Sequence, residues 1–338
     1  MFDFIPTEYF LLAFGFILLI KGGDWFVDAA SGIAKRFKLP ELLIGATVVS
    51  IGTTLPEVMT SAMGAISGSG AIAYGNAIGS IICNTALIAA LTIAIKPGSA
   101  DKKTLKFPVC FFFIAAVFYA LNAYIGNGFD RWSGIVLLVG FVVYMIINVM
   151  NMKKNPETLD IDPIVSPKEE SEDEPSGASF VKDILFLVLG AAVIALGAYL
   201  LVESATAIAH QLGVPESVIG LTVVAIGTSL PELVTAITSL LKGHGALSLG
   251  NIIGANIFNL VLVSGVAVAI SPFDVPMNSL LFGQNASFIL DIPVMFAVMG
   301  IMTLPPLLTG KLKRWQGISL LAIYLVFMVA QFVFVKTV

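Results

Sequence analysis

Residues 44–57 read IGATVVSIGTTLPE, and residues 219–232 read IGLTVVAIGTSLPE, so that 11 of 14 positions are identical. Every matched pair of residues lies 175 positions apart. Each copy ends in a glutamate that directly follows a proline, Glu57 in the first and Glu232 in the second. Both glutamates lie in otherwise apolar stretches, where an ionisable group is costly and therefore indicates a functional site.

The repeat continues beyond these stretches at the same offset. It carries the Gly-Asn pair at 75–76 onto the pair at 250–251, and Asn84 onto Asn259. The chain is therefore a duplicated unit, with motifs at residues 44–84 and 219–259.

The composition places the chain in a membrane. Apolar residues make up 57% of the sequence and charged residues 12%, whereas a soluble domain has about half and about a quarter. A spanning helix needs about 20 apolar residues. We predict an all-α polytopic membrane protein with ten transmembrane helices, near residues 8–33, 41–66, 73–95, 107–124, 133–150, 182–209, 216–241, 246–270, 291–309 and 315–335.

The basic residues predict the orientation of these helices. With the amino terminus outside, only Arg131 and Lys336 remain on the outer side, and Lys21 lies within a helix. An excess of lysine and arginine in the inner connections is typical of membrane proteins. The residues on the inner side are Lys35, Arg36, Lys38, Lys96, Lys102, Lys103, Lys106, Lys153, Lys154, Lys168, Lys182, Lys242, Lys311, Lys313 and Arg314.

Five spans, an odd number, separate equivalent points of the two copies, so the sequence predicts two inverted five-helix repeats. Residues 1–150 would form the first repeat and residues 182–338 the second, in the plasma or inner membrane with both termini outside. Residues 151–181 are rich in Glu, Ser and Pro and predict an acidic cytoplasmic linker, because such a composition buries too little apolar surface to order itself. A weak calcium-sensing role is the alternative for this segment.

Proline suggests how the motif could bind an ion. Pro56 and Pro231 lack an N–H and clash with the carbonyl four residues earlier, so we expect both helices to break. Irregular backbone at membrane depth is tolerated where it lines a cavity, and the freed carbonyls at 50–53 and 225–228 would do so. Hydroxyl and amide oxygens would add to the site, from Thr53, Thr54, Thr228, Ser229, Asn76, Asn84, Asn251 and Asn259.

This set of oxygen ligands suits Ca²⁺, Na⁺ or Mg²⁺ better than Zn²⁺ or Cu²⁺. No histidine is expected near it, because His210 and His244 are predicted to lie in loops. Glu57 and Glu232 together carry two negative charges, which one divalent cation would neutralise. Two empty buried carboxylates would repel one another, so the protein would cross between states only when loaded, as an exchanger does.

The sequence favours one of three functional classes. A secondary antiporter is favoured by the inverted repeat and the twin proline breaks. A cation channel would commonly build a ring of acidic groups from several subunits, and an enzyme would need a nucleophile with a base or a catalytic metal pair. We therefore predict a transporter and no enzyme, with no cofactor, no nucleic-acid partner, no obligate protein partner, and the bilayer and the transported ions as its partners.

The motifs resemble those of a known family. Gly-Thr-(Thr/Ser)-Leu-Pro-Glu followed by Gly-Asn-x-x-Gly-(Ser/Ala)-x-x-x-Asn, present twice, looks like the α-repeats of the sodium/calcium exchangers. The resemblance implies Ca²⁺/Na⁺ antiport by alternating access, with the first and sixth helices sliding against the others. It also implies Ca²⁺ ligands at Glu57, Glu232 and the carbonyls of Thr53 and Thr228, and Na⁺ ligands at the Ser50 and Ala225 carbonyls, Thr54, Ser229, Ser80, Asn84 and Asn259.

Residues of the repeated motifs indicate which ion would be exchanged for Ca²⁺. Proton/calcium exchangers of the same superfamily usually carry a glutamate where Gly79 and Gly254 stand here, so Na⁺ coupling is favoured. A proton/calcium exchanger, or an exchanger of another divalent cation, remains the alternative. Ala255 stands opposite Ser80 and removes one hydroxyl, which leaves the stoichiometry open. Asn259 replaces the aspartate of potassium-dependent relatives, so no K⁺ requirement is expected.

The predicted first helix carries further charges, among them Lys21 and Asp24, which lie three residues apart. This spacing lets them pair locally or anchor the helix at the membrane interface. Lining of an ion pathway is the alternative.

The orientation is testable by labelling. In a background without Cys83 and Cys110, a cysteine in the 155–178 loop should resist an impermeant thiol reagent in intact cells and react after permeabilisation. A cysteine beside Arg131, predicted to lie outside, is the positive control. Labelling of the loop in intact cells would contradict the topology.

Overall fold

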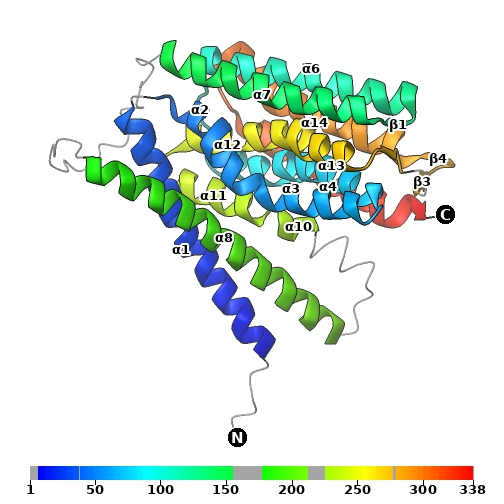
Figure 1. Ribbon diagram of the computed structural model, residues 1–338, viewed down its shortest axis with the longest axis horizontal. Helices are drawn as coiled ribbons and strands as arrows, with labels where there is room; N and C mark the ends of the chain where they lie inside the picture. The colour runs from blue at the N-terminus through cyan, green and yellow to red at the C-terminus, as the bar shows by residue number, and fades with distance from the viewer. Residues whose placement is uncertain (1–6, 38, 155–176, 212–224, 277–278, 338) are drawn as a thin grey trace, which may run out of the picture. The chain divides into compact units, whose positions relative to one another are not determined.

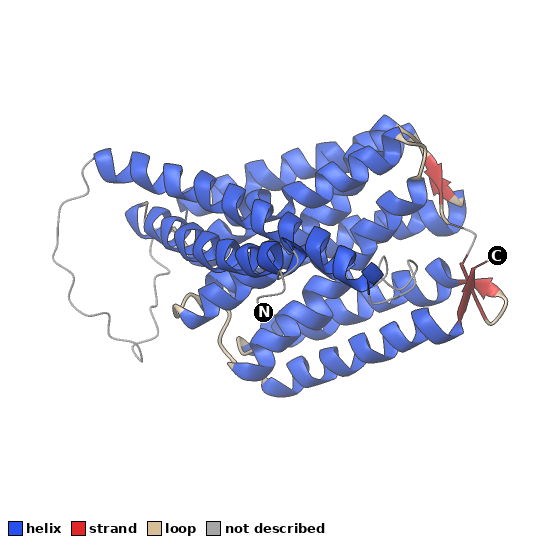
Figure 2. Cartoon of the chain, turned by 90° about the horizontal axis from the view of Figure 1, so that it is seen from below, coloured by secondary structure: helices blue, strands red, loops and turns tan. Residues whose placement is uncertain are grey.

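The computed structural model describes residues 7–37, 39–154, 177–211, 225–276 and 279–337, and these residues are almost entirely helical (Figure 2). The α-helices are α1 (Thr7–Arg36), α2 (Glu41–Ile44), α3 (Ser50–Ile66), α4 (Gly70–Cys83), α5 (Ala90–Ile95), α6 (Lys102–Gly126), α7 (Arg131–Lys154), α8 (Gly177–Gln211), α10 (Ala225–Thr228), α11 (Leu230–Leu241), α12 (Gly245–Phe258), α13 (Ser264–Ile270), α14 (Ile292–Thr309) and α15 (Arg314–Val329).

Other elements are short. The π-helices, in which the turn is widened by one residue, are η1 (Gly45–Val49), η2 (Asn84–Ala89), η4 (Asn259–Val263), η5 (Ser287–Asp291) and η6 (Ala330–Phe334). Strands β1 (Gly128–Phe129) and β2 (Phe273–Asp274) pair antiparallel, and β3 (Ser279–Leu281) pairs antiparallel with β4 (Gln284–Asn285) and β5 (Val335–Thr337).

Nine helical stretches within the described residues are long and apolar enough to cross a membrane. They confirm nine of the predicted spans. The seventh predicted span, 216–241, lies partly outside the described residues, and its described part holds α10 and α11. The expectation of a loop at His210 is wrong, because this residue lies in the last turn of α8. Of the predicted linker 151–181, residues 155–176 lie outside the described part, and α7 and α8 cover its two ends.

The chain divides into two compact units by its internal contacts. Unit 1 comprises Met1–Gly52 and Ile147–Asn251, and unit 2 comprises Thr53–Ile146 and Ile252–Val338. Each unit therefore draws on both halves of the sequence. The division of the sequence into two five-helix halves joined by a linker remains a prediction.

The crossing of α1 and α8 dominates unit 1 (Figure 1). Glycines line the crossing and let the two backbones touch. A Cβ at Gly15 would lie 2.9 Å from the Gly197 carbonyl oxygen, and a Cβ at Gly190 would lie 2.8 Å from the Phe26 backbone nitrogen. Small residues at such positions are typical of membrane helices, because association there depends on close packing.

The contacts at this crossing obey a two-fold relation. They pair Gly15 with Leu201, Gly190 with Phe26, Gly22 with Ile194 and Gly197 with Leu19. Gly15 and Leu201 are the repeat equivalents of Gly190 and Phe26, so the first two contacts are equivalent. The last two contacts are related in the same way. The residue number on α8 falls as that on α1 rises, so the helices run antiparallel. An interface of this kind has two-fold symmetry, and the inverted relation predicted from the sequence is visible at the first helices of the two repeats.

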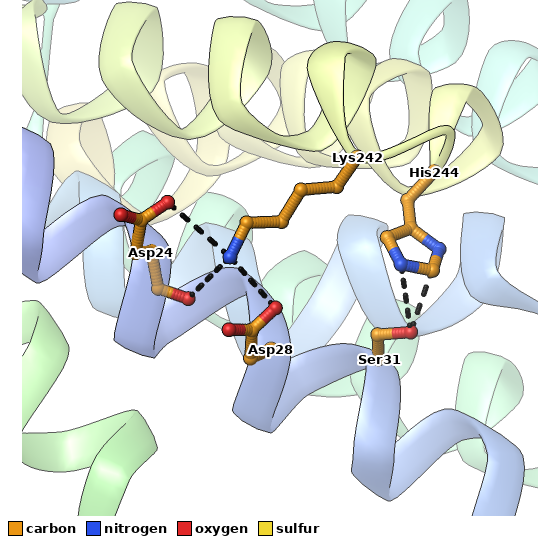
Figure 3. Close-up of polar contacts among 5 residues, drawn as sticks. All are labelled: Asp24, Asp28, Ser31, Lys242 and His244. Atoms are coloured by element: carbon orange, nitrogen blue, oxygen red, sulfur yellow. Dashed lines mark hydrogen bonds and ion pairs between the residues drawn. The ribbon is translucent and has the colours of Figure 1, made fainter. Parts of the chain in front are cut away.

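Polar contacts in unit 1 tie the turn after α11 to α1 (Figure 3) and to α2. Lys242 Nζ lies 3.2 Å from Asp24 Oδ1 and 2.7 Å from Asp28 Oδ1. His244 Nδ1 lies 2.7 Å from Glu41 Oε1, and its Nε2 lies 3.2 Å from the hydroxyl of Ser31.

Asp24 therefore pairs with Lys242, and the ion pairs found among the described residues do not include the local pair of Lys21 and Asp24. The local spacing could not show the partner of Asp24, because Lys242 comes from a turn more than 200 residues away in the sequence.

In unit 2, α4 and η2 pack with η4, α14 and α15. Glycine again permits close approach: a Cβ at Gly134 of α7 would lie 2.8 Å from the Ala269 backbone nitrogen. A Cβ at Gly317 of α15 would lie 2.5 Å from the carbonyl oxygen of Ala90. These contacts pack α5 and α13, which directly follow the π-helices that carry Asn84 and Asn259.

The crossing of α1 and α8 makes Gly190→Ala a test of the fold. The added methyl group would displace the α1 backbone, and overpacking of this kind costs about 1–3 kcal/mol. We expect a lower midpoint of thermal unfolding in detergent. Gly140→Ala on α7 is the matched control, because its Cβ would meet only Phe111 Cζ at 3.7 Å. Equal midpoints for the two variants would contradict the packing described here.

Candidate ion-binding site

The first proline of the motif does not break its helix. α3 runs from Ser50 to Ile66 with Pro56 inside it, so the predicted break is wrong in this copy. Proline costs the helix one backbone hydrogen bond, that to the Gly52 carbonyl, and its fixed φ is compatible with a helix. The irregularity lies earlier, in the π-helix Gly45–Val49 that leads directly into α3.

The second proline lies at a true break. α10 ends at Thr228, Ser229 has φ −91° and ψ 7°, and α11 begins at Leu230 with Pro231 in its first turn. The prediction is confirmed here. Proline is well suited to a first turn, because the N–H that it lacks has no partner within the helix there. The break places Glu232 in the first turn of α11, where the helix dipole favours a negative charge.

Unit 1 holds five of the predicted site residues: Ser50, Ala225, Thr228, Ser229 and Glu232. Glu232 is fully buried, with 0% of its surface exposed, and Ser229 is buried as well. The Ser229 hydroxyl has no hydrogen-bond partner among the described residues. A polar oxygen therefore lies buried within three residues of a buried carboxylate.

Ser50 is fixed by its neighbours in unit 1. Its hydroxyl donates to the Gly45 carbonyl at 2.7 Å and to the Asn251 carbonyl at 3.0 Å. The approach of the backbones depends on glycine, because a Cβ at Gly250 would fall on the Leu42 carbonyl. Asn251, expected to offer an amide oxygen to an ion, has its Oδ1 3.3 Å from the same Ser50 hydroxyl.

Unit 2 holds the other six residues: Thr53, Thr54, Glu57, Ser80, Asn84 and Asn259. Thr53 and Thr54 precede Glu57 by four and three positions on α3, so the three side chains share one helix face. All three are buried, and Glu57 has 0% of its surface exposed.

Asn76 of α4 holds the backbone beside Glu57. Its Nδ2 donates to the Glu57 carbonyl at 3.0 Å and to the Ser61 hydroxyl at 2.8 Å. The sequence predicted Asn76 as a source of an amide oxygen. The contacts add a positioning role that the repeat pattern alone did not indicate.

Asn84 and Asn259 occupy equivalent positions in the backbone as well as in the sequence. Each is the first residue of a π-helix, η2 for Asn84 and η4 for Asn259. π-Helical turns are rare and are frequently found at functional sites. Both asparagines are fully buried, and the amide nitrogen and oxygen of each have no hydrogen-bond partner within the described part of the chain.

Unsatisfied buried amides are unusual, since leaving such a group unpaired costs about 1–3 kcal/mol. Their presence at equivalent positions of the two repeats points to bound water or a bound cation. The joining of Glu57 and Glu232 in a single site remains a prediction. Asn256, another buried polar residue of unit 2, was not among the predicted site residues, and its only signal in the sequence is that its repeat equivalent is the apolar Ile81.

Comparison with known proteins identifies the family. The sequence matches the family described as "Sodium/calcium exchanger protein" over residues 7–150 and 182–333. The sodium/calcium exchanger MaX1 of Methanosarcina acetivorans is 32% identical, over 97% of this chain and 99% of the relative. The membrane protein MJ0091 of Methanocaldococcus jannaschii, which is named as uncharacterised, is 36% identical over 95% and 96% of the two chains.

The fold also matches a solved structure. The sodium-calcium exchanger NCX_Mj superposes with a TM-score of 0.79 at 32% identity, covering 97% of this chain and 99% of that chain. This likeness confirms the predicted fold class, an all-α polytopic membrane protein, and the resemblance recognised from the repeated motifs. The chain therefore belongs to the sodium/calcium exchanger family.

Proposed function

We propose that this protein is a secondary antiporter that exchanges Ca²⁺ for Na⁺ across the membrane by alternating access. The observation that carries the proposal is a pair of fully buried glutamates, Glu57 and Glu232, at equivalent positions of an inverted repeat. Membership of the exchanger family and the names of MaX1 and NCX_Mj support the choice of ions. Glu57 and Glu232 would bind the transported cations together near the membrane midplane.

The buried charge accounts for coupling between the two ions. A carboxylate removed from water is strongly destabilised unless a cation or hydrogen bonds compensate it. One Ca²⁺ or several Na⁺ ions would compensate both glutamates, whereas the empty pair would oppose the change between outward and inward states. Exchange follows, since each ion leaves only when the other can take its place.

The other ligands would be neutral oxygens. Ca²⁺ would add the carbonyls of Thr53 and Thr228, and Na⁺ would use the carbonyls of Ser50 and Ala225. Na⁺ would also use the side chains of Thr54, Ser229, Ser80, Asn84 and Asn259. Such oxygen ligands suit both ions. The second repeat has Ala255 where the first has Ser80, so the two repeats would contribute different numbers of ligands.

The packing of unit 1 suggests which helices would move together during transport. Backbone atoms of α1 and α8 touch at Gly15, Gly190 and Gly197, and helices packed this closely move together more readily than apart. α1 and α8 would slide as one pair against the remaining helices. We also propose the plasma or inner membrane as the location, with both termini outside.

Glutamine substitution tests the shared site. Glu57→Gln or Glu232→Gln keeps the side-chain size and removes one charge. Loss of a buried charged partner costs about 3–5 kcal/mol, so we expect Ca²⁺ uptake into Na⁺-loaded proteoliposomes to fall about 100-fold or more. Glu203→Gln is the matched control, because Glu203 is an exposed glutamate of α8, and its uptake should match the wild type.

Folding of the glutamine variants is checked by gel filtration and thermal unfolding of the purified proteins. Substantial exchange by either folded variant would contradict a site that needs both glutamates.

The driving ion is tested by changing one gradient at a time. We expect ⁴⁵Ca²⁺ flux to follow an opposing Na⁺ gradient and to change little when choline replaces K⁺. Protons should inhibit as the pH falls, because protonated glutamates no longer bind cations. A full-rate flux driven by a pH gradient without Na⁺ would instead favour a proton/calcium exchanger.

A further inference from the structure

Asn256 is a buried polar residue that the repeat does not explain. It lies on α12, three residues before Asn259, and 0% of its surface is exposed. The equivalent residue of the first repeat is Ile81, which is also fully buried. An apolar side chain is therefore compatible with this place in the repeated fold, and the amide of Asn256 is a feature of the second half alone.

The NH₂ group of the Asn256 side chain is hydrogen-bonded to residues of unit 2. Asn256 Nδ2 donates to Thr85 Oγ1 at 2.7 Å and to Met299 Sδ at 3.2 Å. The Thr85 hydroxyl in turn donates to Met299 Sδ at 3.4 Å. Both N–H groups of the amide have partners, and the two contacts orient its plane.

The acceptor of the same amide is left available. Asn256 Oδ1 is buried and has no hydrogen-bond partner among the described residues. A buried amide oxygen whose NH₂ group is already bonded can accept from water or coordinate a cation, and it repels an anion. A bound ligand at this oxygen would remove the cost of leaving it unsatisfied.

The neighbours of Asn256 indicate which ligand. Thr85 follows Asn84 directly in the chain, and Asn259 lies one turn beyond Asn256, so the hydrogen bond to Thr85 links the segments that carry both asparagines. The amides of Asn84 and Asn259 also have no hydrogen-bond partner in the described residues. Three neutral amide groups offer oxygen ligands without charge, which suits a monovalent cation better than Ca²⁺.

We propose that Asn256 Oδ1 is a further ligand, direct or through one water, for a Na⁺ ion held by Asn84 and Asn259. This inference rests on the proposed exchange of Na⁺ for Ca²⁺. Asn256 then contributes to the selection of Na⁺, and its contact with Thr85 keeps its oxygen turned toward the ion.

Two substitutions should shift Na⁺ binding in opposite directions. Asn256→Ile installs the residue of the first repeat and removes the oxygen, so the Na⁺ concentration for half-maximal exchange should rise about fivefold. Asn256→Asp keeps the shape, can accept from the Thr85 hydroxyl and adds a negative charge, so that concentration should fall. The half-saturating Ca²⁺ concentration should change less than twofold in Asn256→Ile.

Thr303→Val is the matched control. Thr303 is a buried residue of α14 whose hydroxyl donates to the Met299 carbonyl at 2.6 Å, within its own helix. Its Na⁺ dependence should equal that of the wild type. A purely structural role for Asn256 would lower the maximal rate and the unfolding midpoint of its variants and leave their Na⁺ dependence unchanged, which would overturn the proposal.

A second measurement separates this inference from the proposed function. A ligand that binds the folded protein raises its unfolding midpoint, so the midpoint of each purified variant is measured against Na⁺ concentration without transport. Opposite shifts in the Na⁺ dependence of Asn256→Ile and Asn256→Asp support the ligand role even if the wild type exchanges no Ca²⁺. Unchanged Na⁺ dependence in Asn256→Asp overturns it, whether or not Asn256→Ile folds.

Discussion

Two carboxylates buried in an apolar, membrane-spanning chain set the requirement that the rest of this structure meets. Glu57 and Glu232 have no exposed surface, and a charge in that position needs other polar groups or a cation near it. The chain supplies them within a few residues of each glutamate. Thr53 and Thr54 are buried on the same helix as Glu57, and Ser229 is buried at the helix break before Glu232.

The backbone of the motif regions is also adapted to buried polar groups. A regular helix uses all of its carbonyls and N–H groups internally, which is why helices cross membranes. Within the motif regions this regularity is interrupted at η1, at Ser229, and at the first turns of η2 and η4. Within the motif regions, irregular backbone thus lies beside buried polar side chains, although π-helical turns also occur outside them, in η5 and η6.

The duplication is kept where it serves packing and relaxed where it serves binding. The crossing of α1 and α8 reproduces its contacts under the two-fold relation, because two similar glycine-lined faces fit each other best. Around the site the halves differ. Ser50 is matched by Ala225, Ser80 by Ala255 and Ile81 by Asn256. In the proposed site, unequal ligands would allow one scaffold to hold cations of different charge in different places.

The membrane class, the repeat, nine of the spans and the position of both glutamates in apolar stretches could all be predicted from the sequence. These depend on local composition, since about 20 apolar residues are needed to cross a bilayer wherever they occur. Features that depend on neighbours distant in the sequence could not be predicted in this way. Pro56 remains inside a helix while Pro231 begins one, Asp24 pairs with Lys242, and Asn256 donates to Thr85. No local pattern encodes these outcomes, because each depends on which residues other helices bring into contact.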